Sequence, residues 1–130
     1  MLILVVDDDI ISRTVMISLL GRLGYQATAA GSGKEALQLL ADSRFDLVLM
    51  DCQMPECDGY KTTAMIRSPL SQTCNPDIPV IALTGDSIAG TVERCLASGM
   101  NDCLTKPVMP ELLQTTIRRW LLKRETTDAL

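Results

Sequence analysis

The sequence predicts a doubly wound α/β fold, in which helices cover both faces of a five-stranded parallel sheet. Five short apolar runs alternate along the chain with segments in which apolar residues recur at helical spacing. Residues 47–50, Leu-Val-Leu-Met, show no polar alternation, which is typical of a strand covered on both faces. Short connections between alternating strands and helices require right-handed crossovers, and these place neighbouring strands parallel.

The predicted strands are the five apolar runs. The last run is short and partly polar, which suits a strand at the edge of the sheet. In chain order the strands are residues 2–6, 25–30, 46–51, 80–84 and 102–105.

A predicted helix follows each strand, and several helices carry start or stop signals. Gly24 and Gly99 end the first and the fourth helix, and the last helix follows Pro110. Ser32 and Glu35 form a capping box at the start of the second helix. In chain order the helices are residues 11–23, 33–40, 59–67, 88–96 and 111–124.

The 130 residues are predicted to form one domain that spans residues 1–124. This length is enough to bury one core without disulfide or metal staples, and no repeat or linker indicates a second domain. Residues 68–79 contain three prolines and no periodicity, which indicates a loop. Residues 125–130 are predicted to be a frayed tail.

The composition excludes several kinds of partner. The formal net charge is −4, and the one group of basic residues, between 118 and 124, falls near a helix end that favours cations, so no nucleic-acid contact is expected. No apolar stretch approaches about 18 residues, so this domain is not expected to contact a membrane. Five cysteines without a CxxC pair, and no histidine, argue against a zinc site and indicate reduced thiols in a cytoplasmic protein.

Polar residues follow four of the predicted strands at their carboxyl ends. This edge is where open α/β sheets bind their ligands. Several carboxylates in one cleft repel one another, and oxygen ligands of this kind suit Mg²⁺. The residues predicted at this edge are Asp7, Asp8, Asp9, Asp51, Thr84 and Lys106.

Two interpretations of these aspartates compete. Capping of the first helix accounts for one of the first three, but not for three of them together with Asp51 after the third strand. Alternatively, a carboxylate acts as a nucleophile toward phosphorus, assisted by a divalent ion, a lysine and a hydroxyl. Thr84 and Lys106 are ordinary residues singly, but together they complete this set.

Four ordered motifs resemble those of response-regulator receiver domains, and they span nearly the whole chain. The resemblance implies a flavodoxin-like sheet in the order 2-1-3-4-5 with five helices on two faces. It also implies a phosphoacceptor signalling domain of a two-component system or phosphorelay, which catalyses its own phosphorylation and slow autodephosphorylation and is not otherwise an enzyme. The motifs are VVDDD at 5–9, LVLMDCQMPECDGY at 47–60, ALTGD at 82–86 and GMNDCLTKP at 99–107.

The resemblance assigns the metal and acceptor roles by position. Asp51 would accept the phosphoryl group from phosphohistidine. Asp8 and Asp51 would bind Mg²⁺ directly, together with the main-chain carbonyl of Gln53. Asp7 would act through a water molecule.

The resemblance also assigns the residues that respond to the phosphoryl group. Thr84 and Lys106 would pair with it, and the Lys106–Pro107 peptide would be cis. Cys103 stands where the family usually has a switching aromatic residue, and a thiol offers no ring, so the usual coupling is in doubt and relay of phosphate is favoured. Cys52, next to the acceptor, should have a raised thiol pKa because its surroundings are acidic.

The segment at residues 50–60 resembles receivers of hybrid histidine kinases. The implied partner is a histidine kinase or a histidine-phosphotransfer protein, with Mg²⁺ as cofactor, in a phosphorelay in the cytoplasm. A homodimer is compatible with the family.

Three rival interpretations differ from this one by particular residues. A flavodoxin-type electron carrier would need a phosphate-binding loop after the first strand, where three aspartates would repel a flavin phosphate. A magnesium-dependent phosphatase with an aspartate nucleophile would want a second acid at the position of Gln53. A receiver-like domain that has lost phosphorylation would typically lack Asp8, Asp51 or Lys106.

Overall fold

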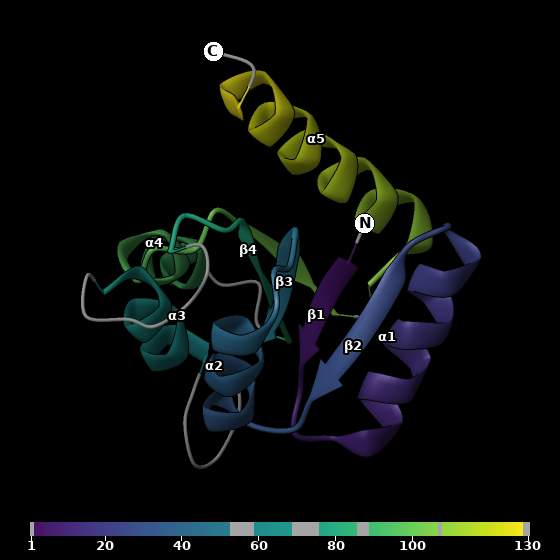
Figure 1. The fold of residues 1–130 in the computed structure, drawn as a ribbon, viewed down its shortest axis with the longest axis horizontal. Coiled ribbons are helices and arrows are strands. Elements are labelled where there is room, and N and C mark those ends of the chain that lie inside the picture. Colours follow the sequence, from purple (N-terminus) through teal and green to yellow (C-terminus); the bar gives the residue numbers. More distant parts are fainter. Residues whose placement is uncertain (1, 53–58, 69–75, 86–88, 107, 129–130) are drawn as a thin grey trace.

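A computed structural model gives the fold and describes residues 2–52, 59–68, 76–85, 89–106 and 108–128 (Figure 1). Strands and helices alternate strictly along the described chain, as predicted. The strands are β1 (Leu2–Val6), β2 (Gln26–Ala30), β3 (Leu47–Asp51), β4 (Val80–Thr84) and β5 (Asp102–Thr105). The helices are α1 (Ile10–Arg22), α2 (Gly33–Asp42), α3 (Gly59–Arg67), α4 (Ala89–Ala97) and α5 (Pro110–Asp128).

The five strands form one parallel sheet in the order β2-β1-β3-β4-β5. This confirms the predicted topology, and β5 lies at an edge as its polar composition indicated. In the register of the sheet, Val6 pairs with Met50, Met50 with Ala82, and Ala82 with Cys103. The carboxyl ends of the strands therefore meet at one edge.

Alternating side chains of the strands build two separate cores. Val6, Met50 and Ala82 face α2, α3 and α4, whereas the side chains of Val5 and Leu49 face α1 and α5 (Figure 1). Strands β3 and β4 are buried along their whole length because helices cover both of their faces.

Two glycines close helices in the same way. Gly24 has φ +92° and follows α1, and the Tyr25 amide donates to the carbonyl of Leu20 at 2.9 Å. Gly99 has φ +99° and follows α4, where the Met100 amide donates to the carbonyl of Cys95 at 3.1 Å. Only glycine adopts this left-handed conformation readily, so both residues end a helix and turn the chain into the next strand.

The element boundaries differ from the prediction by one or two residues at several ends and by four residues at the end of the last helix. Helix α1 begins at Ile10, one residue earlier than its periodicity indicated, because Asp9 caps it. Residues 125–128, predicted to belong to a frayed tail, continue α5 as far as Asp128, and no glycine or proline after Pro110 interrupts that helix. The predicted loop at 68–79 lies largely outside the described residues.

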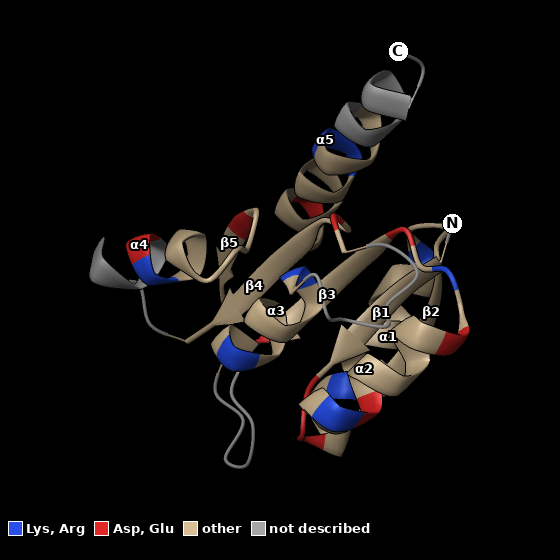
Figure 2. Ribbon diagram, turned by 60° about the vertical axis from the view of Figure 1, so that its left-hand side comes forward, with Lys and Arg blue, Asp and Glu red and all other residues tan. Residues whose placement is uncertain are grey.

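Charged residues lie on the helices and at strand ends, and the middles of the strands carry none (Figure 2). Within the described ranges, every helix is too short or too polar to cross a membrane.

Candidate functional site

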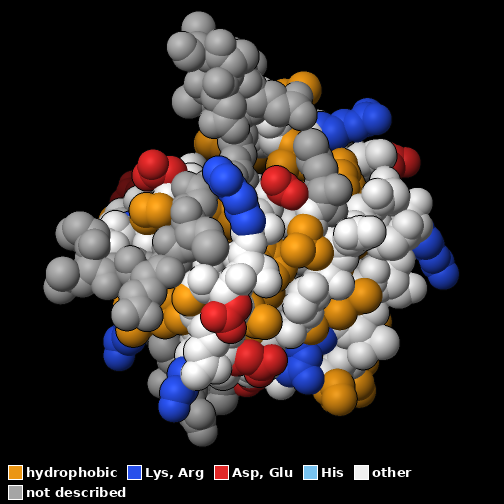
Figure 3. All heavy atoms as spheres, in the orientation of Figure 1, with side chains coloured by type: hydrophobic (Ala, Val, Ile, Leu, Met, Phe, Trp, Pro, Cys, Tyr) orange, Lys and Arg blue, Asp and Glu red, His pale blue; other side chains and the backbone are white. Residues whose placement is uncertain are grey.

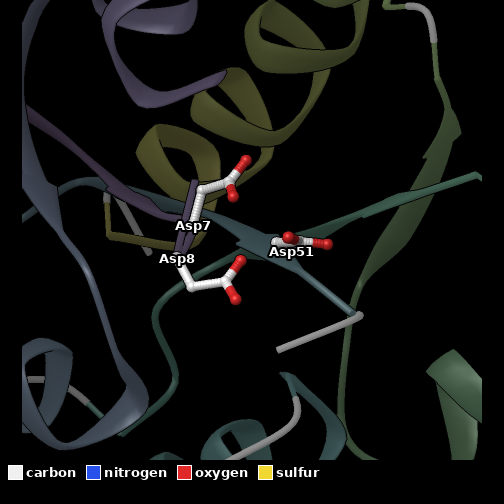
Figure 4. A group of neighbouring side chains, drawn as sticks. All are labelled: Asp7, Asp8 and Asp51. Carbon is white, nitrogen blue, oxygen red and sulfur yellow. The ribbon is translucent and has the colours of Figure 1, made fainter. Parts of the chain in front are cut away.

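Three carboxylates meet at the carboxyl edge of the sheet (Figure 4). Asp7 and Asp8 follow β1, and Asp51 is the last residue of β3. One oxygen from each lies within 4.8 Å of the others. Asp7 and Asp51 are buried, with exposed fractions of 3% and 4%, whereas Asp8 is exposed. The sheet register thus brings together aspartates that lie more than 40 residues apart in sequence.

The three consecutive aspartates have different local roles. Asp9 caps α1, because its Oδ1 accepts from the Ile11 amide at 2.9 Å. Asp7 Oδ1 accepts from the Asp9 amide at 3.0 Å. Capping therefore accounts for Asp9 and leaves the carboxylates of Asp7 and Asp8 for another purpose.

The buried acid pair faces a lysine. Lys106 Nζ lies 3.5 Å from Asp51 Oδ1 and 3.9 Å from Asp7 Oδ2. Burial raises the pKa of the Asp7 carboxyl and the charge of Asp51 raises it further, whereas the Asp9 amide and Lys106 oppose the rise. Asp7 is therefore a carboxylate that a nearby cation would stabilise.

Thr84 ends β4 at the same edge and is 2% exposed. Its carbonyl accepts from the Lys106 amide at 2.7 Å, so the main chain joins the predicted hydroxyl to the predicted lysine. The structure thus places five of the predicted site residues at one edge. They are Asp7, Asp8, Asp51, Thr84 and Lys106. Two other predictions, the carbonyl of Gln53 and the cis peptide at Pro107, lie outside the described residues.

Cys103 lies half-buried on β5, in a group of thiols beneath α4. Burial and the Cys95 thiol raise its pKa to about 11. Burial also raises the pKa of Cys52 to about 12, with Cys95 as the next cause. The predicted direction for Cys52 is confirmed, but the predicted cause, an acidic neighbourhood, is wrong. The thiol lies on the face of the sheet that packs against α4, among other thiols.

Tyr60 joins the same thiol group and was not among the predicted site residues. Its pKa is raised by burial and by Cys52 and Cys95, and the guanidinium of Arg94 on α4 lies 4.2 Å from the centre of its ring. Tyr60 on α3 therefore brings an aromatic ring against α4, whereas Cys103 on β5 has no ring.

Gly59 is a further residue that the sequence reasoning did not assign to the site. A Cβ at this position would lie 2.5 Å from the carbonyl oxygen of Asp51 and 2.8 Å from Met50 Cγ. The first turn of α3 therefore packs directly on the end of β3. The sequence signal that could have indicated this close packing is a glycine at the first position of a helix. Serine, threonine, aspartate or proline is more usual near a helix start.

The described donor atoms suit a hard cation. Asp7, Asp8 and Asp51 offer carboxylate oxygens within 4.8 Å of one another, and oxygen ligands are those that Mg²⁺ prefers. The exposed carboxylate of Asp8 leaves the group open to solvent, which suits an ion that keeps several waters.

Residues 3–118 match the family model of the response regulator receiver domain. Sensor histidine kinase RcsC of Escherichia coli K12 is 44% identical over 117 residues, which cover 90% of this chain and 12% of the kinase. The chain therefore spans about an eighth of the length of this relative.

Solved structures show the same architecture. The receiver domain of sensor histidine kinase PA1611 from Pseudomonas aeruginosa PAO1, solved with a magnesium ion in its active site cleft, is 38% identical with a TM-score of 0.81. The alignment covers 92% of this chain and 96% of that one. The receiver of Saccharomyces cerevisiae Ssk1, in complex with the histidine phosphotransfer protein Ypd1, is 27% identical with a TM-score of 0.85, over 95% and 90% of the two chains.

Proposed function

Because this chain belongs to the response regulator receiver domain family, we propose that it accepts a phosphoryl group from phosphohistidine on Asp51, with Mg²⁺ as cofactor. The observation that carries the proposal is the geometry around one carboxylate. Asp51 is buried, and one of its carboxylate oxygens lies within 4.8 Å of a carboxylate oxygen of Asp7 and of Asp8. Lys106 Nζ lies 3.5 Å from Asp51 Oδ1.

Phosphoryl transfer needs mainly positioning and charge neutralisation. A carboxylate oxygen of Asp51 attacks the phosphorus, a P–O bond forms, and the P–N bond to the donor histidine breaks. The electron pair of that bond stays on the imidazole nitrogen, which leaves. Lys106 already lies against the Asp51 carboxylate and pairs with the oxygens of the incoming group.

The acid group fits Mg²⁺ by the chemistry of its donors. Asp8 and Asp51 would hold the ion directly and Asp7 through a water, with the carbonyl of Gln53, outside the described residues, as a further ligand. When bound, the ion supplies positive charge that offsets the charge of the transferred group. It would also offset the burial and the Asp51 charge that together raise the pKa of Asp7.

The phosphoryl group carries roughly two negative charges into the pocket, in place of the single charge of the free Asp51 carboxylate. Lys106 and the hydroxyl of Thr84 would draw toward them, and because Thr84 ends β4 and Lys106 follows β5, this biases the arrangement of α4, β5 and α5. Cys103 supplies no ring to this response, and we propose that the domain chiefly relays the phosphoryl group.

The donor is proposed to be a histidine kinase or a histidine-phosphotransfer protein of a phosphorelay. Its domain must cover the rim of the acid pocket for a phosphohistidine to reach Asp51. Helix α1 starts at that rim, and its side chains Ile10, Ile11 and Val15 are 66%, 71% and 61% exposed. Figure 3, which has the orientation of Figure 1, shows apolar side chains dispersed among polar and charged ones. We propose that the apolar face of α1 seats the donor.

Two finer proposals concern the setting of the domain. Three thiols without disulfides, Cys52, Cys95 and Cys103, suit a reducing compartment such as the cytoplasm. Homodimerisation and the lack of nucleic-acid binding remain predictions, which sedimentation with and without a phosphoryl donor and a nucleic-acid binding assay would test.

Acceptance of phosphate is tested by intact mass after incubation with acetyl phosphate, with and without Mg²⁺. The wild type is expected to gain one phosphoryl group only when Mg²⁺ is present. Asp51→Asn is expected to gain none, because an amide oxygen is a poor nucleophile, whereas the control Asp42→Asn, at an exposed position on α2, behaves as wild type. Stoichiometric phosphorylation of Asp51→Asn would contradict the assignment of the acceptor.

Docking on α1 is tested by comparing two phosphoryl donors. Ile11→Lys is expected to slow transfer from a phosphorylated histidine-phosphotransfer domain by roughly tenfold, because a central apolar contact is worth about 1–2 kcal/mol. Transfer from acetyl phosphate, which needs no docking, should be unchanged. The matched control is Leu96→Lys on α4, where the leucine is 54% exposed. Equal rates for the two variants with the protein donor would contradict docking on α1.

A further inference from the structure

The main chain behind the acid group is held by an arginine. Arg13 lies on α1, and its Nη1 donates to the carbonyl oxygen of Asp7 at 2.9 Å. This guanidinium therefore bonds to the backbone that carries the acids, whereas Lys106 pairs with the carboxylates themselves. The two cations thus bind different groups, one the main chain and the other the side chains of the acids.

The carbonyl that Arg13 binds belongs to the peptide that joins Asp7 to Asp8. The Asp7 amide donates to the Ala30 carbonyl at 3.1 Å, and its carboxylate accepts from the Asp9 amide at 3.0 Å. With the bond from Arg13, the backbone of Asp7 is held on both sides. Because a peptide is planar, holding its carbonyl also sets the direction in which Asp8 leaves the turn.

The guanidinium occupies a space that a glycine leaves open. A Cβ on Gly31, in the turn between β2 and α2, would lie 2.7 Å from Arg13 Nη1. The same turn is held by the Gly31 amide, which donates to Glu35 Oε2 at 3.2 Å. Any larger residue at position 31 would push the end of the Arg13 side chain aside.

We propose that Arg13 is a positioning residue for Mg²⁺: it fixes the Asp7–Asp8 peptide so that both carboxylates face the ion, and Gly31 provides the space for it. The inference rests on the proposed function, in which these acids hold Mg²⁺. Partners that orient metal ligands contribute strongly to metal affinity, and their loss typically weakens binding by roughly 10–100-fold.

The first test measures Mg²⁺ binding by titration calorimetry. Arg13→Gln is expected to weaken binding by on the order of tenfold, because the carbonyl of Asp7 loses its charged donor. The matched control is Arg22→Gln, which removes the same charge from the exposed far end of the same helix and should bind Mg²⁺ as wild type. Equal affinities for these two variants would overturn the proposal.

The second test displaces the guanidinium without removing its charge. Gly31→Ala is expected to weaken Mg²⁺ binding as Arg13→Gln does, and to add nothing when the two are combined, because both break the same contact. Wild-type affinity in Gly31→Ala, or full additivity in the double variant, would overturn the proposal. This variant keeps the proposal testable if Arg13→Gln does not fold.

Two further measurements separate positioning from general stability and from failure of the proposed function. Thermal unfolding in a chelator should place Gly31→Ala within a few degrees of wild type, and its phosphorylation rate should recover at high Mg²⁺ concentration. A rate that stays low at saturating Mg²⁺ would overturn a role in metal positioning. Absence of saturable Mg²⁺ binding in the wild type itself would instead overturn the proposed function, and this inference with it.

Discussion

At the scale of single residues, the environment gives identical side chains different chemistry. Asp9 caps a helix, Asp8 faces solvent, and Asp7 is buried against Asp51. Burial and the Asp51 charge raise the pKa of Asp7 above its ordinary value of 3.8. The pocket thus holds a carboxylate whose charged form is disfavoured even with Lys106 at 3.9 Å.

The raised pKa of Asp7 predicts a pH-dependent cost to stability. A carboxyl whose folded pKa exceeds 3.8 stabilises the fold below that pH, and this contribution is lost as the pH rises through the folded pKa. Asp7→Asn should therefore raise the unfolding temperature in a chelator at pH 7 by on the order of a few degrees. The gain should disappear as the pH falls toward 4.

Thermal unfolding of wild type and Asp7→Asn across this pH range, with Asp42→Asn as an exposed control, makes the measurement. The prediction would be contradicted by an Asp7→Asn variant that is less stable than wild type at pH 7, or by a gain in unfolding temperature that grows as the pH falls. Either result would show that burial of the charged Asp7 carboxylate does not destabilise the fold.

At the scale of elements, the close approach of α3 to the end of β3 determines the position of the acceptor residue, Asp51. Gly59 begins α3 and leaves no room for a Cβ beside the Asp51 carbonyl. The hydroxyl of Thr63 donates to the Gly59 carbonyl at 2.8 Å within the same buried turn. The position of Asp51 therefore depends on how closely α3 packs on β3.

Gly59→Ala should disturb both stability and phosphorylation. The added Cβ would meet a backbone oxygen at 2.5 Å, and overpacking of this kind costs about 1–3 kcal/mol. Displacement of the Asp51 backbone should also slow phosphorylation by acetyl phosphate by on the order of tenfold. Urea unfolding and the rate of mass gain measure the two effects.

Gly21→Ala is the matched control, because it makes the same change inside a helix at a position with no neighbouring atom within 4 Å of the new Cβ. It should stabilise the protein by up to about 1 kcal/mol through helix propensity and leave the phosphorylation rate unchanged. Equal behaviour of the two alanine variants would refute a special role for Gly59.

At the scale of the whole molecule, two polar junctions join helices α3 and α5 to the starts of strands β4 and β5. Arg67, at the end of α3, donates to the carbonyls of Gly99 and Ile78 at 3.0 and 2.6 Å and to Asn101 Oδ1 at 2.8 Å. It thereby joins α3 to the segments that precede β4 and β5. On the face of β5 and α5, Trp120 Nε1 donates to Asp102 Oδ2 at 3.0 Å.

Trp120 is the only tryptophan in the sequence and therefore reports on the face that follows β5. If the domain chiefly relays phosphate, phosphorylation should change the emission of Trp120 little in the wild type, because Cys103 next to Asp102 has no ring to move. Cys103→Tyr, which supplies a ring at this position, should respond more than wild type. Emission spectra with and without acetyl phosphate and Mg²⁺ make the comparison, and Asp51→Asn supplies the baseline.

A large shift in the wild type would contradict relay as the main role. Equal responses of wild type and Cys103→Tyr would show that the missing ring is not the reason for a small wild-type response.

The fold and the inventory of the site followed from the sequence. Apolar runs and helical periodicity are local patterns, so the five strands, the five helices and the glycines that end α1 and α4 were predicted from neighbouring residues alone. The edge on which Asp51, Thr84 and Lys106 lie followed from the rule that parallel strands place their carboxyl ends together.

Only the tertiary structure decided which local role each of these residues has. Whether Asp7 or Asp9 caps α1, which backbone Arg13 holds, and why Gly31 and Gly59 have no side chain all depend on distances between segments far apart in sequence. The physical reason is that periodicity records which face of an element is buried, whereas hydrogen bonds and close contacts depend on packing to within a few tenths of an ångström.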